Sequence, residues 1–115
     1  MKFGVKISEN ILHLSMEGDL IGEDNGLDII KAVNDSIDSG VLKAVVDISG
    51  LRYINSSGIG VLITILTKFR NKGGEIFLIE PSENVKKLLI ITKLNAIFNM
   101  APNSEEAILA LNKVD

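Results

Sequence analysis

Two adjacent hydroxyl groups stand where an apolar segment gives way to a helical pattern. Ser56 and Ser57 follow Asn55 and precede Gly58, and the apolar helical pattern begins at Ile59. The first N–H groups of a helix lack partners within the helix, and the helix dipole places partial positive charge there. A phosphoryl group on Ser56 would therefore be electrostatically favoured. The same residues also suit a simpler role, in which Asn55 or Ser56 caps the helix.

The serine pair does not fit a hydrolase. The nucleophile elbow Gly-x-Ser-x-Gly needs glycine at position 54 or 55, and these positions hold Ile54 and Asn55. A serine triad also needs a base, and the only histidine, His13, is expected in the middle of a strand, far away in sequence. We therefore expect no catalytic residue.

Other ligand chemistry is only weakly indicated. Gly58-Ile-Gly60 resembles part of a phosphate-binding loop but lacks the third glycine of the dinucleotide fingerprint, so the glycines more plausibly allow close packing or the approach of a partner. Asp47 stands alone at its strand end, which disfavours a phosphoaspartate receiver. Four acidic residues near the first predicted helix match no trusted metal-binding loop; they are Asp19, Glu23, Asp24 and Asp28. We expect neither a metal nor a cofactor.

Composition narrows the class of protein. The chain has 115 residues, of which 46% are hydrophobic and 4% aromatic, so we expect one domain spanning residues 1–115 with an aliphatic core. It has no cysteine, which excludes disulfides and thiolate metal sites and fits a reducing compartment. Its net charge is −3 and its basic residues are dispersed, so direct nucleic-acid binding is not expected.

The longest apolar runs are short. Residues 59–66 and 88–91 fall well below the roughly 20 apolar residues that a membrane-spanning helix needs. The N-terminus lacks the apolar core of a signal peptide. We therefore expect a soluble, cytoplasmic protein that makes no direct membrane contact.

The apolar periodicity predicts alternating strands and helices. Alternation around Glu9-Asn10 predicts an antiparallel hairpin, and a turn is expected at 22–25. Helices are predicted over 27–37, over 56–72, up to residue 91 after a cap at Ser82, and over 104–111. Strands are predicted over 43–48, 76–79 and 96–98.

This order of elements indicates an α/β fold on a mixed, mostly parallel sheet of about five strands with about four helices. Functional loops of such sheets gather at the carboxyl ends of the strands. We therefore expect Asp19, Asn55, Ser56 and Ser57 to lie at one edge.

The predicted helix 56–72 carries more aliphatic residues than one core stripe needs. Ile59, Leu62, Ile63, Leu66 and Phe69 follow helical spacing, and Val61 and Ile65 lie off that stripe. Beside the small residues Gly58 and Gly60, Val61 and Ile65 could form the apolar centre of a docking surface. Alternatively, they pack against a neighbouring helix.

Four segments together resemble the STAS domain family, which includes the bacterial anti-sigma factor antagonists. The run from Asp47 to Leu62 resembles the family signature, in which a strand leads to a serine pair and an apolar helix. Residues 17–20, 71–75 and 85–89 resemble three further family segments in the family's order. The resemblance covers essentially the whole chain and implies a STAS-type fold.

The resemblance also implies a function. In antagonists of this family, the first serine of the pair is phosphorylated by an anti-sigma factor kinase of the GHKL type. That role falls on Ser56, and the implied docking residues are Asp19, Asn55, Ser56, Ser57 and Gly58, with Val61 and Ile65 as the apolar centre. Two positions depart from the family pattern, because Asn55 replaces the usual Asp and Ile21 occupies another usually acidic position.

The resemblance leaves three hypotheses. The first is an antagonist, monomeric or weakly dimeric, that binds an anti-sigma factor and is switched off by phosphorylation. The second is a constitutive STAS subunit of a transport or signalling complex, without phosphorylation, which the uncharged Asn55 favours. The third is a domain that binds a small ligand or nucleotide.

Overall fold

The computed structural model describes residues 2–21 and 26–113. The turn expected at 22–25, with Glu23 and Asp24, lies outside the described residues. The elements within them are β1 (Lys2–Ser8), β2 (Ile11–Leu20), α1 (Gly26–Asp38), β3 (Lys43–Ile54), α2 (Ser56–Asn71), β4 (Glu75–Ile79), α3 (Glu83–Ile91), the 3-10 helix η1 (Leu94–Ala96), β5 (Asn99–Ala101) and α4 (Ser104–Lys113).

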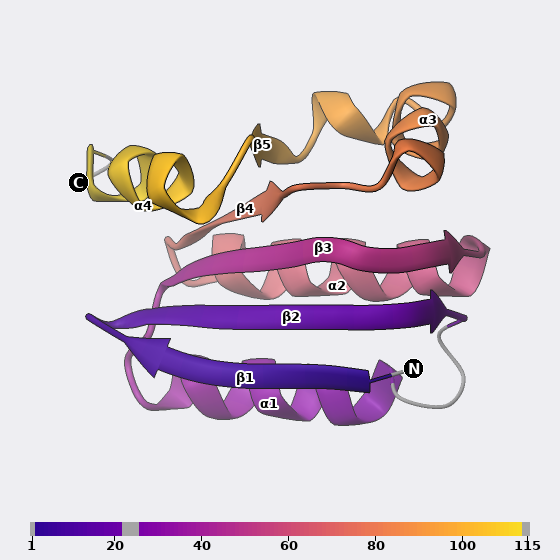
Figure 1. Cartoon of the computed structure of the whole chain (residues 1–115). Helices are drawn as coiled ribbons and strands as arrows, with labels where there is room; N and C mark the ends of the chain where they lie inside the picture. Colours follow the sequence, from indigo (N-terminus) through magenta and orange to yellow (C-terminus); the bar gives the residue numbers. More distant parts are fainter. Residues whose placement is uncertain (1, 22–25, 114–115) are drawn as a thin grey trace.

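The described strands form one five-stranded sheet in the order β1-β2-β3-β4-β5 (Figure 1). β1 pairs with β2 in an antiparallel hairpin that turns at Glu9 and Asn10, and each later pair of neighbours is parallel. The expected fold class is therefore confirmed. Because the strands from β2 onward are parallel, the carboxyl ends of β2, β3 and β4 share one edge of the sheet.

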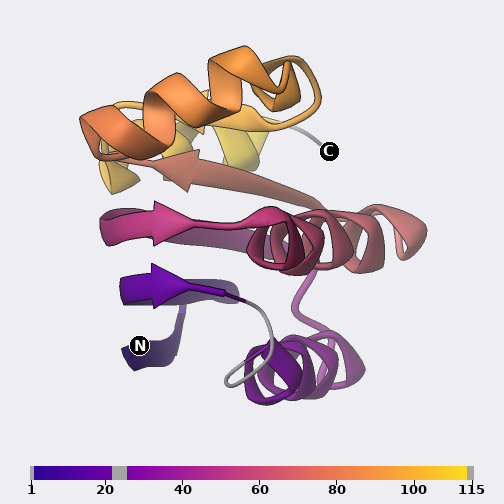
Figure 2. The ribbon, with the colours of Figure 1, turned by 90° about the vertical axis from the view of Figure 1, so that its right-hand side faces the viewer.

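Helices cover the two faces of the sheet unequally. α1 and α2 lie side by side on one face (Figure 2). The main core lies beneath them, and alternate strand residues such as Leu14 and Val46 point into it. α4 covers part of the opposite face, where Ala107 and Leu111 pack with Val45 and Ile79 in a smaller cluster.

β3 is longer than the sequence predicted. It continues past Ile48 to Ile54, and its register with β2 shifts between Ser15 and Glu17 and again between Gly18 and Asp19. These irregularities interrupt the alternation of apolar and polar residues, which made residues 49–54 look like a loop. The connection to α2 is reduced to Asn55.

The predicted last strand, 96–98, is wrong. Leu94–Ala96 form η1, and Lys93 before it adopts a left-handed φ of 62°. Phe98 is buried because it packs into the main core, while sheet pairing begins only at Asn99. The sequence predicted a strand here because Phe98 is apolar and buried, although it does not pair in the sheet.

The described helices include none that is long and apolar enough to cross a membrane.

Candidate functional site

The carboxyl ends of β2 and β3 meet at the start of α2. Asp19 pairs with Tyr53 in the register and Leu20 pairs with Ile54. The backbone N–H of Asn55 then donates to the carbonyl oxygen of Leu20 at 3.3 Å. The structure thus brings Asp19 and the Asn55–Ser57 segment to one edge of the sheet, as the sequence predicted.

Asn55 is the N-cap of α2. Its extended backbone (φ −101°, ψ −177°) precedes the helix, and its Oδ1 accepts the Gly58 N–H at 2.8 Å. The carbonyl oxygen of Asn55 accepts the Ile59 N–H at 2.9 Å. Of the two caps that the sequence allowed, Asn55 is therefore the one used.

The hydroxyl groups of Ser56 and Ser57 do not cap the helix. Both residues are exposed in the first turn of α2, and no hydrogen bond joins either hydroxyl to another residue within 2–21 or 26–113. The first turn contains no acidic side chain. An anion at Ser56 would meet the positive end of the helix dipole.

Gly58 holds the first turn of α2 against β2. A Cβ at this position would overlap the carbonyl oxygen of Leu20 and lie 2.8 Å from the Ile54 side chain. Gly58 is buried, so its contribution to the edge is close backbone packing. Gly60, two residues further along α2, has open space around it.

Val61 and Ile65 do not form an exposed docking centre. Val61 is 9% exposed and Ile65 is 0% exposed, and both belong to the main core. A Cβ on Gly26 of α1 would lie 3.1 Å from Val61, so α1 covers this side of α2. The side-packing alternative is therefore correct, and the expected apolar centre of the docking surface must be replaced.

Sequence reasoning missed two exposed side chains at the same edge. The Arg52 guanidinium lies 3.4 Å from the Asp19 carboxylate, Nη2 to Oδ1. Tyr53 is 57% exposed and lines a small cavity of about 140 Å³ with Asn84 and Leu88 of α3. The second register irregularity falls at Arg52, because the pairing passes from Gly18–Leu51 directly to Asp19–Tyr53. The alternation typical of a strand is broken there, so these adjacent exposed residues gave no periodic signal.

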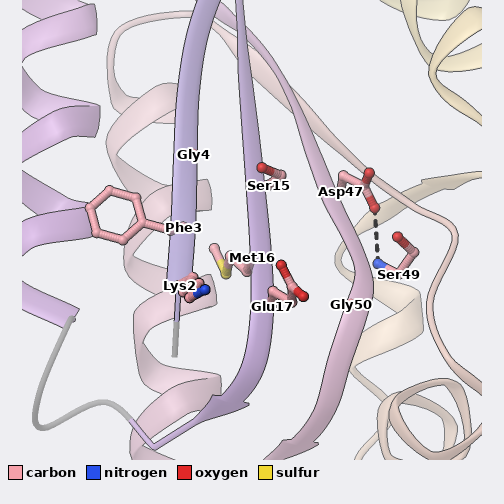
Figure 3. Close-up of a pocket in the computed structure, with 9 residues that line it drawn as sticks. All are labelled: Lys2, Phe3, Gly4, Ser15, Met16, Glu17, Asp47, Ser49 and Gly50. Carbon is pink, nitrogen blue, oxygen red and sulfur yellow. Dashed lines mark hydrogen bonds between the residues drawn. The ribbon is translucent and has the colours of Figure 1, made fainter.

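A second concavity lies on the sheet, away from α2. It measures about 520 Å³, and its polar lining includes Ser15, Glu17, Asp47 and Ser49, which point to the side opposite Phe3 and Met16 (Figure 3). Asp47 Oδ1 accepts the Ser49 N–H at 2.9 Å.

The predicted site residues do not line this concavity. Within the described residues, no group of three or more His, Asp or Glu side chains could hold a metal ion. His13 lies in the middle of β2 and lines a neighbouring cavity. It does not lie at the Ser56 edge, where the carboxyl ends of β2 and β3 meet the start of α2.

Comparison with known proteins establishes the family. The sequence model of the STAS domain matches residues 2–107, so the chain belongs to the STAS domain family. A Thermotoga neapolitana protein named as an anti-sigma factor antagonist is 28% identical over 106 residues, covering 92% of this chain and 94% of that protein. BtrV of Bordetella bronchiseptica, named likewise, is 34% identical over 77 residues, covering 67% of this chain and 66% of BtrV.

Solved structures agree with the fold. The crystal structure of a Thermotoga maritima protein named as an anti-sigma factor antagonist superposes with a TM-score of 0.86 at 27% identity, over 96% of this chain and 94% of that one. The anti-sigma factor antagonist SpoIIAA in its unphosphorylated form superposes with a TM-score of 0.75 at 19% identity, over 96% of this chain and 98% of that one.

Proposed function

We propose that this chain is an anti-sigma factor antagonist that binds an anti-sigma factor at its Ser56 edge, and that phosphorylation of Ser56 dissolves the complex. The docking surface consists of Asp19, Tyr53, Asn55, Ser56 and Ser57, and Gly58 holds it in place from beneath. Its function is binding rather than catalysis, and it acts in the cytoplasm as one STAS module. The relatives named as anti-sigma factor antagonists support this class of partner.

One observation carries the phosphorylation proposal. Asn55 supplies the cap of α2, so the exposed Ser56 hydroxyl is not needed for the helix. A kinase of the GHKL type would transfer the γ-phosphoryl group of ATP to Ser56. The Oγ–H bond breaks and an Oγ–P bond forms, ADP leaves, and the hydroxyl proton passes to a base on the kinase.

Phosphorylation would act through charge. It adds about −1.5 to −2 charges and a hydrated group at the centre of the docking surface. Burying that charge against the partner costs free energy unless the partner supplies a counter-charge. The unmodified protein binds and the phosphorylated protein dissociates.

The test is intact-mass measurement after incubation with ATP and the anti-sigma factor kinase encoded nearest its gene. We expect one added phosphoryl group in the wild type and in Ser57→Ala, and none in Ser56→Ala. Ser56→Asp should keep its fold by circular dichroism and lose kinase binding. Binding of Ser56→Asp as tight as that of the wild type would overturn the switch.

A second candidate function rests on Asn55. This residue caps α2 without bringing a charge beside Ser56, which suits a constitutive subunit that docks the same edge without phosphorylation. Stable binding to the partner without any ATP-dependent mass change would establish that function instead.

A further inference from the structure

Arg52 and Asp19 form an ion pair beside the modification site. The pair joins β3 to β2 at 3.4 Å, and its side chains are 78% and 46% exposed. Ion pairs between side chains this exposed are weak, because water screens them and both side chains lose freedom. The ion pair therefore positions Arg52 but is weak enough for Arg52 to exchange Asp19 for a stronger partner.

The pair lies near the carboxyl ends of β2 and β3, at the edge of the sheet where α2 begins. Asp19 directly precedes Leu20, and the Leu20 carbonyl accepts the Asn55 N–H at 3.3 Å and packs against Gly58. The Arg52 guanidinium therefore binds the residue that directly precedes Leu20, and the Leu20 carbonyl accepts the N–H of Asn55, the cap of α2. Ser56 follows the cap immediately and is four residues from Arg52 along the chain, at the same edge of the sheet.

We propose that phosphorylated Ser56 takes Arg52 from Asp19, so that one modification changes the docking surface at two points. This inference rests on the proposed phosphorylation of Ser56. A phosphoserine dianion offers three acceptor oxygens and forms stronger charge-assisted hydrogen bonds with a guanidinium than an exposed carboxylate does. The exchange breaks one exposed ion pair and forms another a short distance away.

The exchange releases Asp19 as an unpaired anion. In the unmodified protein the charges of Asp19 and Arg52 compensate each other. After the exchange, Arg52 compensates part of the phosphoryl charge and Asp19 adds its own. The partner then meets negative charge at the ends of both β2 and β3, rather than at Ser56 alone.

The chain has two arginines, Arg52 and Arg70, which makes the exchange directly measurable. Arg70 is bound to Glu75 at 3.1 Å and to the Ile97 carbonyl at 3.0 Å, at the other end of α2. We would record the two arginine Nε–Hε resonances with serine or with directly incorporated phosphoserine at position 56. Phosphoserine should shift the Arg52 resonance and leave that of Arg70 in place.

Asp19→Asn supplies the matched control. In the unmodified protein this variant should move the Arg52 resonance, because the carboxylate partner is gone. With phosphoserine at position 56, wild type and Asp19→Asn should show the same Arg52 resonance. If phosphoserine leaves the Arg52 resonance at its unmodified position, the pair with Asp19 persists and the exchange is refuted.

Phosphorus NMR gives a second readout. The pH midpoint of the phosphoserine resonance should rise by about half a unit or more in Arg52→Gln, because a nearby cation lowers the pKa of an acid. Lys72→Gln, at the far end of α2, should not change it. Equal midpoints in wild type and Arg52→Gln would also refute the exchange. Incorporated phosphoserine makes these results independent of any kinase, whose failure to act would count only against the proposed function.

Discussion

Gly58 in α2 lies directly against the main-chain carbonyl of Leu20 at the end of β2, with no space for a side chain between them. This contact sets how closely the first turn of α2, which carries Ser56, packs against the edge of the sheet. It depends on a missing Cβ, so it can be tested by adding a single methyl group.

Gly58→Ala should destabilise the protein by about 1–3 kcal/mol, because the Cβ must displace either the helix or β2. Gly60→Ala is the matched control in the same helix, where a Cβ meets open space. It should stabilise by about 0.5–1 kcal/mol, since alanine is the better helix former. Urea denaturation measures both changes. Equal effects at the two positions would contradict the close contact.

Two substitutions of Asn55 separate the effect of its capping hydrogen bond from the effect of a negative charge at the same position. Asn55→Ala removes the acceptor of the Gly58 N–H and should cost about 1 kcal/mol in urea denaturation. Asn55→Asp keeps an acceptor and places a favourable negative charge at the helix start, so stability should stay equal or rise slightly.

Asn55→Asp should also accelerate phosphorylation of Ser56, because it restores the Asp that antagonists of this family usually carry at this position. The initial rate of mass increase with the kinase and ATP measures this. A rate at or below that of the wild type would show that the uncharged Asn55 does not limit the reaction.

The revised docking surface predicts opposite outcomes for an exposed and a buried apolar residue. Tyr53→Ala should change stability by less than about 0.5 kcal/mol and weaken partner binding about tenfold or more, as aromatic anchors do. Ile65→Ala should cost about 2–5 kcal/mol, because Ile65 is fully buried. Denaturation and titration calorimetry measure the two effects. A stable Ile65→Ala variant with weakened binding would restore the original docking centre.

Ser82 is expected to matter for stability although it lies outside the site. Its Oγ donates to the Leu51 carbonyl at 2.8 Å and accepts the Val85 N–H at the start of α3. Ser82→Ala should cost about 1–2 kcal/mol, since both the cap and a strand contact are lost. Ser104→Ala, at the start of α4, should cost less in the same assay.

The sequence predicted the features that local patterns determine. Periodicity located α1, α2 and the hairpin, and Ser82 was recognised as the cap of α3. The parallel order then placed Asp19 and Ser56 at one edge, because carboxyl ends of parallel strands meet there.

What the sequence did not predict depends on neighbours. Val61 and Ile65 are buried because α1 covers a second side of α2, and helical spacing does not reveal how many partners a helix has. The extent of β3 and the role of Arg52 depend on register irregularities, which follow from the pairing of β2 with β3.

Both helices beside the docking surface are fastened to the same stretch of β3. α3 is tied to Leu51 through Ser82, and α2 follows Ile54 with Asn55 as its only connection. We therefore expect the part of the proposed docking surface that these helices hold to be preorganised, so that its binding to a partner would cost little conformational entropy. Any adjustment of shape on binding would then fall mainly to the partner, so we expect related surfaces to be distinguished by side-chain chemistry rather than by flexibility.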